Sequence, residues 1–130
     1  MSNAAATPPG PDQPPGPAQP DDAMLVVFCT FPNADEAARV ANVVVSEGLA
    51  ACVNILRDIR SIYFWNDQVV NSAETLCLIK TARTRFDDLV ARLSDLHPYD
   101  VPEIVAVRPT DVNQPYLRWV LNETSSSRGG

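Results

Sequence analysis

Residues 50–81 read AACVNILRDIRSIYFWNDQVVNSAETLCLIKT, and this stretch predicts two long β-strands joined by a tight turn. Apolar and β-branched residues recur on both sides of Asn66-Asp67, residue types that tolerate the positive φ of a two-residue hairpin turn. The alternation of inward and outward residues slips near Arg57-Asp58, which indicates a bulge or bend in the first strand. The segment is therefore predicted to form a long antiparallel hairpin.

Both faces of the returning strand are apolar. By parity Thr75, Cys77 and Ile79 share one face, while Leu76 and Leu78 share the other. Helices in a small α+β domain cover only one face of the sheet, so the second apolar face predicts oligomerisation. A strand that lies beneath a long loop is the alternative interpretation.

The segments on either side of the hairpin complete the fold. Residues 25–31 form an apolar run that ends at Pro32, as a buried strand would. A helix is then expected, with Asn33 as its cap, Glu36 at the reciprocal position and Gly48 as the closing residue.

After the hairpin, a capping arrangement over 84–87 is expected to begin a second helix, which Pro98 ends. Residues 103–108 are expected to form a strand, and an apolar stripe over 116–121 predicts a short final helix. The predicted class is α+β: a ferredoxin-like βαββαβ antiparallel sheet with an extra C-terminal helix.

The ends of the chain differ in composition from the middle. Seven of the twelve prolines precede Ala23, so residues 1–22 are interpreted as a disordered Pro-rich tail, residues 23–123 as the domain and residues 124–130 as a second tail. The chain has neither the pattern of a secretory signal nor an apolar run long enough to span a membrane. We therefore expect a cytoplasmic protein without a membrane partner.

Charge, glycine and cysteine usage exclude several functions. The net charge of −6 disfavours nucleic acid as a partner. Gly48 is the only glycine between Pro17 and Arg128, which excludes phosphate-binding glycine loops and organic cofactors that need them. The three cysteines form no CxxC pair, and their odd number favours reduced thiols.

Several motifs occur in an order that resembles the CutA divalent-cation-tolerance family. They are Leu49-Ala-Ala-Cys-Val-Asn54, Ser61-Ile-Tyr-Phe-Trp65, Glu74 with Leu78-Ile-Lys-Thr81, His97-Pro-Tyr-Asp-Val-Pro-Glu103 and Tyr116-Leu-Arg-Trp119. The resemblance covers residues 25–122. It implies a cytoplasmic homotrimer, ferredoxin-like and PII-like in build, with copper binding and a part in the response to metal ions.

The resemblance also implies a metal site. It puts Cys29 and His97 at metal positions, and Glu103 is a candidate third ligand for Cu²⁺ or another divalent cation. Two departures from the family bear on this: Asp67 replaces a turn glycine of many bacterial members, and Leu96 replaces the first of two adjacent histidines in some of them. The alternatives are a helix-terminal structural role for His97 and a buried apolar role for Cys29.

A cleft between subunits is the second candidate site. Its expected residues are Tyr63, Trp65, Glu74, Lys80, Tyr99 and Trp119. Aromatic rings with polar tips suit interfaces, although trimer packing or an intersubunit ion pair would use the same side chains. The functional hypotheses are a homotrimeric copper-binding protein of divalent cation tolerance or, alternatively, a PII-like sensor or scaffold that binds a small molecule or partner protein in the cleft. Because the chain has one histidine, an enzyme with Cys29 as nucleophile is not expected.

Overall fold

The computed structural model describes residues 22–125, so most of the two predicted tails lies outside it. Its elements are β1 (Met24–Phe31), α1 (Ala34–Ser46), β2 (Cys52–Trp65), β3 (Gln68–Ala82), the 3₁₀ turn η1 (Arg83–Arg85), α2 (Phe86–Leu96), β4 (Ile104–Val107) and α3 (Gln114–Glu123). The strands form one antiparallel sheet in the order β2-β3-β1-β4. The predicted α+β class and element order are confirmed. Within the described residues, no helix has the length and apolarity needed to cross a membrane.

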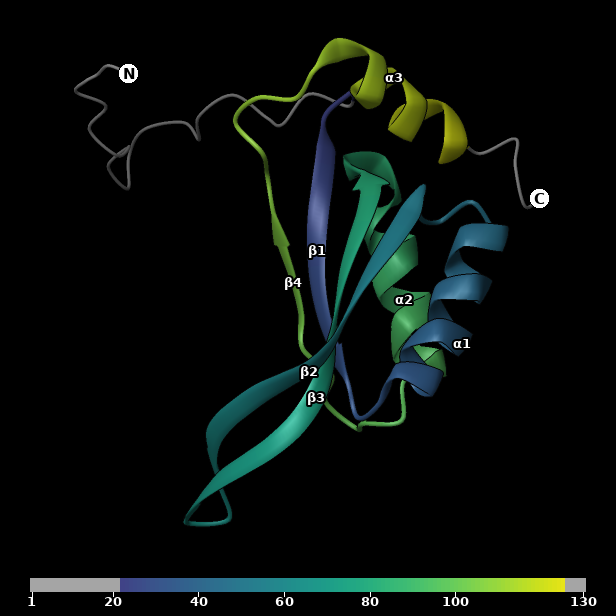
Figure 1. Ribbon diagram of the computed structural model, residues 1–130. Coiled ribbons are helices and arrows are strands. Elements are labelled where there is room, and N and C mark those ends of the chain that lie inside the picture. Colours follow the sequence, from purple (N-terminus) through teal and green to yellow (C-terminus); the bar gives the residue numbers. More distant parts are fainter. Residues whose placement is uncertain (1–21, 126–130) are drawn as a thin grey trace, which may run out of the picture.

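The core lies between the sheet and two helices. Figure 1 shows α1 and α2 together on one side of the sheet, with α3 at one end of it. The side chains that fill this layer include Val27, Phe31, Val40, Val44, Ile79, Leu89 and Leu93. Thr75, Cys77 and Ile79 are buried on this face, as their parity predicts. Burial of these apolar side chains is the main source of stability for the fold.

Helix α1 has the predicted Asn33 cap and Gly48 closing residue, whereas the carboxylate of Glu36, expected at the reciprocal position, accepts from Arg39. The Asn33 side chain accepts a 2.8 Å hydrogen bond from the Glu36 N–H, and Gly48 follows the helix at φ 75°. Arg92 on α2 makes two 2.9 Å hydrogen bonds to the Glu47 carboxylate. This two-pronged pair fixes α1 against α2.

The predicted cap of α2 is wrong. Residues 83–85 form a 3₁₀ turn, and α2 starts at Phe86. Within the described residues, no side chain makes a hydrogen bond that caps this helix start. Thr84 therefore lies inside the turn that precedes the helix, not at the position from which its hydroxyl could reach the first free N–H groups.

The hairpin has both of its predicted irregularities. The register of β2 on β3 shifts between Leu56 and Ile59, and Asp58 between them has φ 61°, as expected for a bulge. Asn66 and Asp67 have φ 51° and 60°, the two positive values of a type I′ turn. Beyond the bulge, residues 59–74, here called the hairpin arm, extend away from the body of the protein (Figure 1).

The sheet face opposite α1 and α2 is apolar but only partly covered. Val26 and Phe28 of β1 lie opposite Val107 and Val105 of β4, and both β4 valines are exposed. Helix α3 packs over the end near Met24, where a second apolar cluster forms. The predicted second apolar face is therefore present and largely open in the single chain.

Thr124, the residue that follows the predicted domain of residues 23–123, caps the end of α3. Thr124 is buried, and its hydroxyl donates a 2.8 Å hydrogen bond to the Val120 carbonyl in the last turn of α3. The Thr124 N–H donates to the same carbonyl at 3.2 Å, so both donors of this residue close the last turn of α3.

Candidate functional site

His97, the only histidine of the chain, follows the last residue of α2 and turns into the protein. Its Nε2 lies 2.7 Å from the Thr30 carbonyl oxygen, and its Nδ1 accepts a 3.1 Å hydrogen bond from the Tyr99 N–H. Because Nδ1 accepts, the proton of the neutral ring is on Nε2, which donates to Thr30. Both ring nitrogens are therefore used within the chain.

The surroundings of His97 favour its neutral form. The residue is 8% exposed, and its ring stacks on Phe31 with centroids 4.4 Å apart. Burial lowers the pKa of His97, although the Thr30 carbonyl and the carboxylates of Glu36 and Glu74 act in the opposite direction. The His97 side chain at the end of α2 is therefore a buried neutral ring.

Tyr99 connects this ring to the hairpin arm. Its hydroxyl donates a 2.7 Å hydrogen bond to Glu74 Oε2 at the base of the arm, and its ring centroid is 4.9 Å from that of His97. Burial, the bond to Glu74 and nearby Tyr63 raise the pKa of Tyr99 well above its ordinary value. Tyr63 itself accepts a 3.4 Å hydrogen bond from the Ser72 hydroxyl. We call Tyr63, Glu74, His97 and Tyr99 the arm-base cluster.

Lys80 and Trp119 lie in a different place, at the α3 end of the sheet. Lys80 stands opposite Cys52 across β2 and β3, and its ammonium donates to Cys52 Sγ at 3.5 Å and to the Asn54 side chain. Tyr116 brings its hydroxyl to 3.6 Å from the same sulfur and packs against Trp119. Burial, with the contact to Cys52, raises the pKa of Tyr116 to about 12.

The six cleft residues expected from sequence thus separate within one chain. Tyr99 contacts Glu74 at the base of the arm, and Tyr63 is near enough to Tyr99 to raise its pKa. Lys80 and Trp119 lie near α3, and Trp65 ends β2 beside the turn. Glu74 and Lys80 share a strand face, but six residues of strand separate them by about 20 Å. They form no ion pair inside the described part of the chain.

The candidate metal ligands do not fit a copper ion. Cys29 is 0% exposed on the core face of β1, opposite Cys77, and burial, with smaller effects of Cys77 and Glu103, raises the pKa of its thiol to about 12. Glu103 is exposed before β4, and the lone pair of His97 Nδ1 is already engaged. Across residues 22–125, no three His, Cys, Asp or Glu side chains converge in a way that could hold a metal ion.

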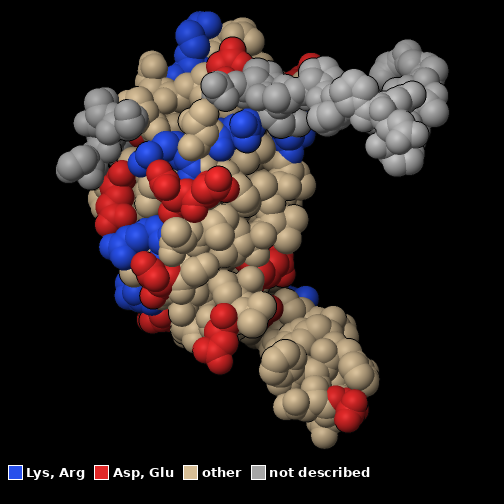
Figure 2. Space-filling view, turned by 180° about the vertical axis from the view of Figure 1, so that it is seen from behind, with Lys and Arg blue, Asp and Glu red and all other residues tan. Residues whose placement is uncertain are grey.

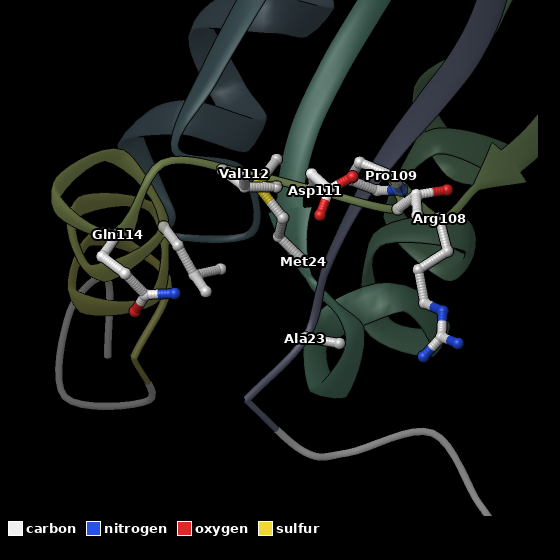
Figure 3. Close-up of a pocket in the computed structure, with 9 residues that line it drawn as sticks. Ala23, Met24, Arg108, Pro109, Asp111, Val112 and Gln114 are labelled. Carbon is white, nitrogen blue, oxygen red and sulfur yellow. The ribbon is translucent and has the colours of Figure 1, made fainter. Parts of the chain in front are cut away.

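An open pocket of about 430 Å³ lies where β1 begins and the chain enters α3. Its walls include Met24, Arg108, Asp111, Val112 and Gln114, and Figure 3 shows the Arg108 side chain extending away from Val112 and Gln114. The pocket contains none of the site residues expected from sequence. Its polar groups do not converge on one point, so the arm-base cluster is the stronger candidate site.

Several contacts of these sites could not be predicted from the sequence. The Thr30 carbonyl and the Phe31 ring have no signature as partners of His97, because the fold brings them together across 67 residues. Counting back equally along both strands from the Trp65–Gln68 pair would place Cys52 opposite Thr81. The bulge adds one residue to β2 only, so Cys52 lies opposite Lys80 instead.

Comparison with known proteins gives a consistent result. A model of the family described as "CutA1 divalent ion tolerance protein" matches residues 25–123. The chain is similar to the "Divalent-cation tolerance protein CutA" of Thermus thermophilus, with 44% identity over 99 residues, 76% of this chain and 96% of that protein. The protein with the same description from Pyrococcus horikoshii is 38% identical over 101 residues, 78% of this chain and 98% of that protein.

Solved structures agree with the sequence comparison. The structure of the "Divalent cation tolerance protein (Cut A1)" from Thermus thermophilus superposes with a TM-score of 0.76 at 43% identity, covering 78% of this chain and 99% of that one. The likeness therefore extends over nearly the whole of the related chain.

Proposed function

Because the chain belongs to the CutA1 divalent ion tolerance protein family, we propose that it acts as a homotrimer in the tolerance of divalent cations. Assignment to the ferredoxin-like class is part of the proposal, and the element order and the strand order β2-β3-β1-β4 support it. A cytoplasmic location is also proposed, and the three free cysteines support it.

The exposed apolar side chains of the hairpin arm are the observation that best supports the trimer. Ile62, Phe64, Trp65 and Val69 are 67%, 68%, 63% and 72% exposed. The face of the arm seen in Figure 2 is mostly uncharged, with acidic atoms near its end and basic atoms where it joins the body. A two-stranded hairpin is at best marginally stable by itself in water. The arm therefore needs a surface to cover it, and the open sheet face of another copy offers apolar side chains such as Val105 and Val107.

Light scattering during gel filtration tests the trimer. The wild type is expected to have the mass of three chains, and Phe64→Asp is expected to shift it towards one, because a buried aromatic contributes roughly 1.5–3 kcal/mol at each contact. Val101→Asp is the matched control, since Val101 is 86% exposed but lies outside the arm. A trimeric Phe64→Asp variant, or a monomeric wild type, would refute the proposed assembly.

The family resemblance implies copper(II) as the cation, and copper binding by this chain stays a prediction. Cys29, His97 and Glu103 do not form a ligand set in this conformation, so no step is assigned to a bound ion. Isothermal titration of copper(II) into the assembled protein tests direct binding. A saturable isotherm would support it, whereas heats equal to those of dilution would mean that tolerance does not operate through copper bound by this chain.

A PII-like sensor or scaffold is the second candidate, and the arm-base cluster favours it. Glu74 is held by Tyr99 through one carboxylate oxygen, with Tyr63 nearby, so polar groups gather where the arm leaves the sheet. In a trimer this point would lie next to another copy and could receive a small molecule. Saturable binding in a metabolite screen that Tyr63→Phe and Tyr99→Phe weaken would support this function, and binding unaffected by both would contradict it.

A non-enzymatic role is part of the same proposal. Burial raises the pKa of the Cys29 thiol to about 12. His97 is the only histidine of the chain, and both of its ring nitrogens are hydrogen-bonded to backbone groups. A nucleophile needs an ionised or activated form and a base within reach, and this pair offers neither.

A further inference from the structure

The family resemblance assigns His97 to the position of a metal ligand. Both of its ring nitrogens, however, make hydrogen bonds to backbone groups of the same chain. We infer that His97 is a structural clamp and not a copper ligand: its ring ties the segment after α2 to the end of β1 and, through Tyr99, to Glu74. Every contact of this clamp lies within one chain. The inference therefore does not depend on the proposed trimer.

The hydrogen bonds of the two ring nitrogens argue against metal binding by His97. A metal ion needs an imidazole nitrogen with an available lone pair. Nε2 carries the proton that it donates to Thr30 at 2.7 Å, and the Nδ1 lone pair accepts the Tyr99 N–H at 3.1 Å. Coordination through either atom would leave a buried or partly buried backbone group without its partner, which is unfavourable.

The other two expected ligands do not compensate for that loss. The Cys29 side chain is fully buried on the core face of β1, and its neighbour across the sheet is Cys77. Exposed Glu103 contributes one hard carboxylate, which Cu(II) does not prefer over imidazole. A divalent ion would have to displace core packing to reach the thiol.

The clamp also has a positive role at this corner of the fold. Arg39 of α1 donates a 2.7 Å hydrogen bond to the Leu96 carbonyl, one residue before His97. The imidazole then holds Thr30 and Tyr99, and Tyr99 holds Glu74. These hydrogen bonds are joined through the backbone of residues 96–99, so they connect α1 to the base of the hairpin arm and fix where the arm leaves the sheet.

Electron paramagnetic resonance with copper(II) tests the metal half of the inference. Any imidazole nitrogen coupling in the untagged 130-residue chain must come from His97, because this chain contains no other histidine. We expect no such coupling, whether copper binds elsewhere or does not bind at all. A coupling present in the wild type and lost in His97→Asn would overturn the inference.

Nuclear magnetic resonance tests the structural half and needs only the wild type at first. In protein labelled with ¹⁵N-histidine, the single imidazole is expected as the neutral tautomer with its proton on Nε2 at pH near 7. Addition of zinc(II) is expected to leave both nitrogen shifts unchanged. A proton on Nδ1, or a shift of either nitrogen with zinc(II), would contradict the clamp.

A matched pair of variants then separates the two hydrogen bonds. His97→Asn keeps an acceptor near the position of Nδ1, whereas His97→Gln keeps a donor near the position of Nε2. Hydrogen exchange at the Tyr99 amide should stay slow in the wild type and in His97→Asn, and should speed up about tenfold or more in His97→Gln. Equal exchange rates in all three proteins would refute the contact on which the clamp rests.

Discussion

The Tyr99 hydroxyl donates a 2.7 Å hydrogen bond to the Glu74 carboxylate, which joins the segment after α2 to the base of the hairpin arm. Glu74 pairs with Ile59, the first residue of β2 after the bulge. The bond therefore acts at the point where the hairpin leaves the sheet. Disturbing it should affect the arm before it affects the core, which lies on the other side of β3.

Tyr99→Phe is expected to lower the free energy of unfolding by about 1–2 kcal/mol. It removes a hydrogen bond to a charged group and leaves a partly buried carboxylate oxygen without its donor. Urea denaturation at one fixed chain concentration measures the change, because the stability of an oligomer depends on concentration. Glu74→Gln is the control that keeps an acceptor for the hydroxyl, and it should lose less; an equal or larger loss would argue against the bond.

Stability should depend on pH through His97. Because the folded-state pKa lies below the ordinary value of 6.5, the unfolded chain binds a proton first as the pH falls. Stability is then fully present above about pH 7 and is lost as the pH falls from 6.5 towards the lowered folded pKa. Denaturation curves of wild type and His97→Asn over this range should converge at the acid end. A wild type that gains stability relative to the variant on acidification would contradict the buried neutral ring.

The three thiols should differ in their reactivity. Burial raises the pKa of Cys29 to about 12 and that of Cys77 to about 11, whereas Cys52 is only half-buried beside the Lys80 ammonium. A thiol reagent at neutral pH should therefore modify at most one cysteine of the native chain, since the thiolate is the reactive form. Mass spectrometry after labelling should find Cys52 modified and Cys52→Ser unlabelled. Native labelling of Cys29 would show that β1 opens far more readily than its burial implies.

The turn of the hairpin can be improved by one substitution. Asp67 has φ 60°, a conformation that glycine adopts without the steric cost that a side chain brings. Asp67→Gly creates the Asn-Gly pair favoured in type I′ turns and should raise stability by about 0.5–1 kcal/mol. Thermal unfolding measures the gain. Asp67→Val, whose branched side chain opposes positive φ, is the control expected to move the midpoint down; a gain in both variants would mean that the turn geometry is different.

Much of the fold could be predicted because its signals are local. Asn33 and Gly48 mark the ends of α1 by their own chemistry, and both have the predicted geometry. The bulge at Asp58 is visible as a slip in alternation. The predicted cap of α2 is wrong because Thr84, which has the residue type of a helix cap, lies in a 3₁₀ turn. Residues near a helix start compete for the cap position, and the path of the preceding chain decides between them.

The site was less predictable because it depends on which distant groups meet. The predictions from sequence placed His97 with Cys29 and Glu103 in a metal site, and Tyr99 and Glu74 with Lys80 in a cleft between subunits. Within one chain, His97, Tyr99 and Glu74 lie together. Lys80 lies near α3, because six residues of strand separate it from Glu74. Face parity tells which side of a sheet a residue occupies, but says little about its distance from another residue on that side.

The sequence by itself determined the elements, their order, the type I′ turn and the apolar second face of the sheet, because backbone preference and apolar periodicity act over a few residues. Only the tertiary structure decided what His97 does. Its two nitrogens are committed by the Thr30 carbonyl and the Tyr99 N–H, and no local pattern shows which backbone groups a side chain will face. An imidazole is a ligand or a clamp according to whether the fold leaves it a lone pair.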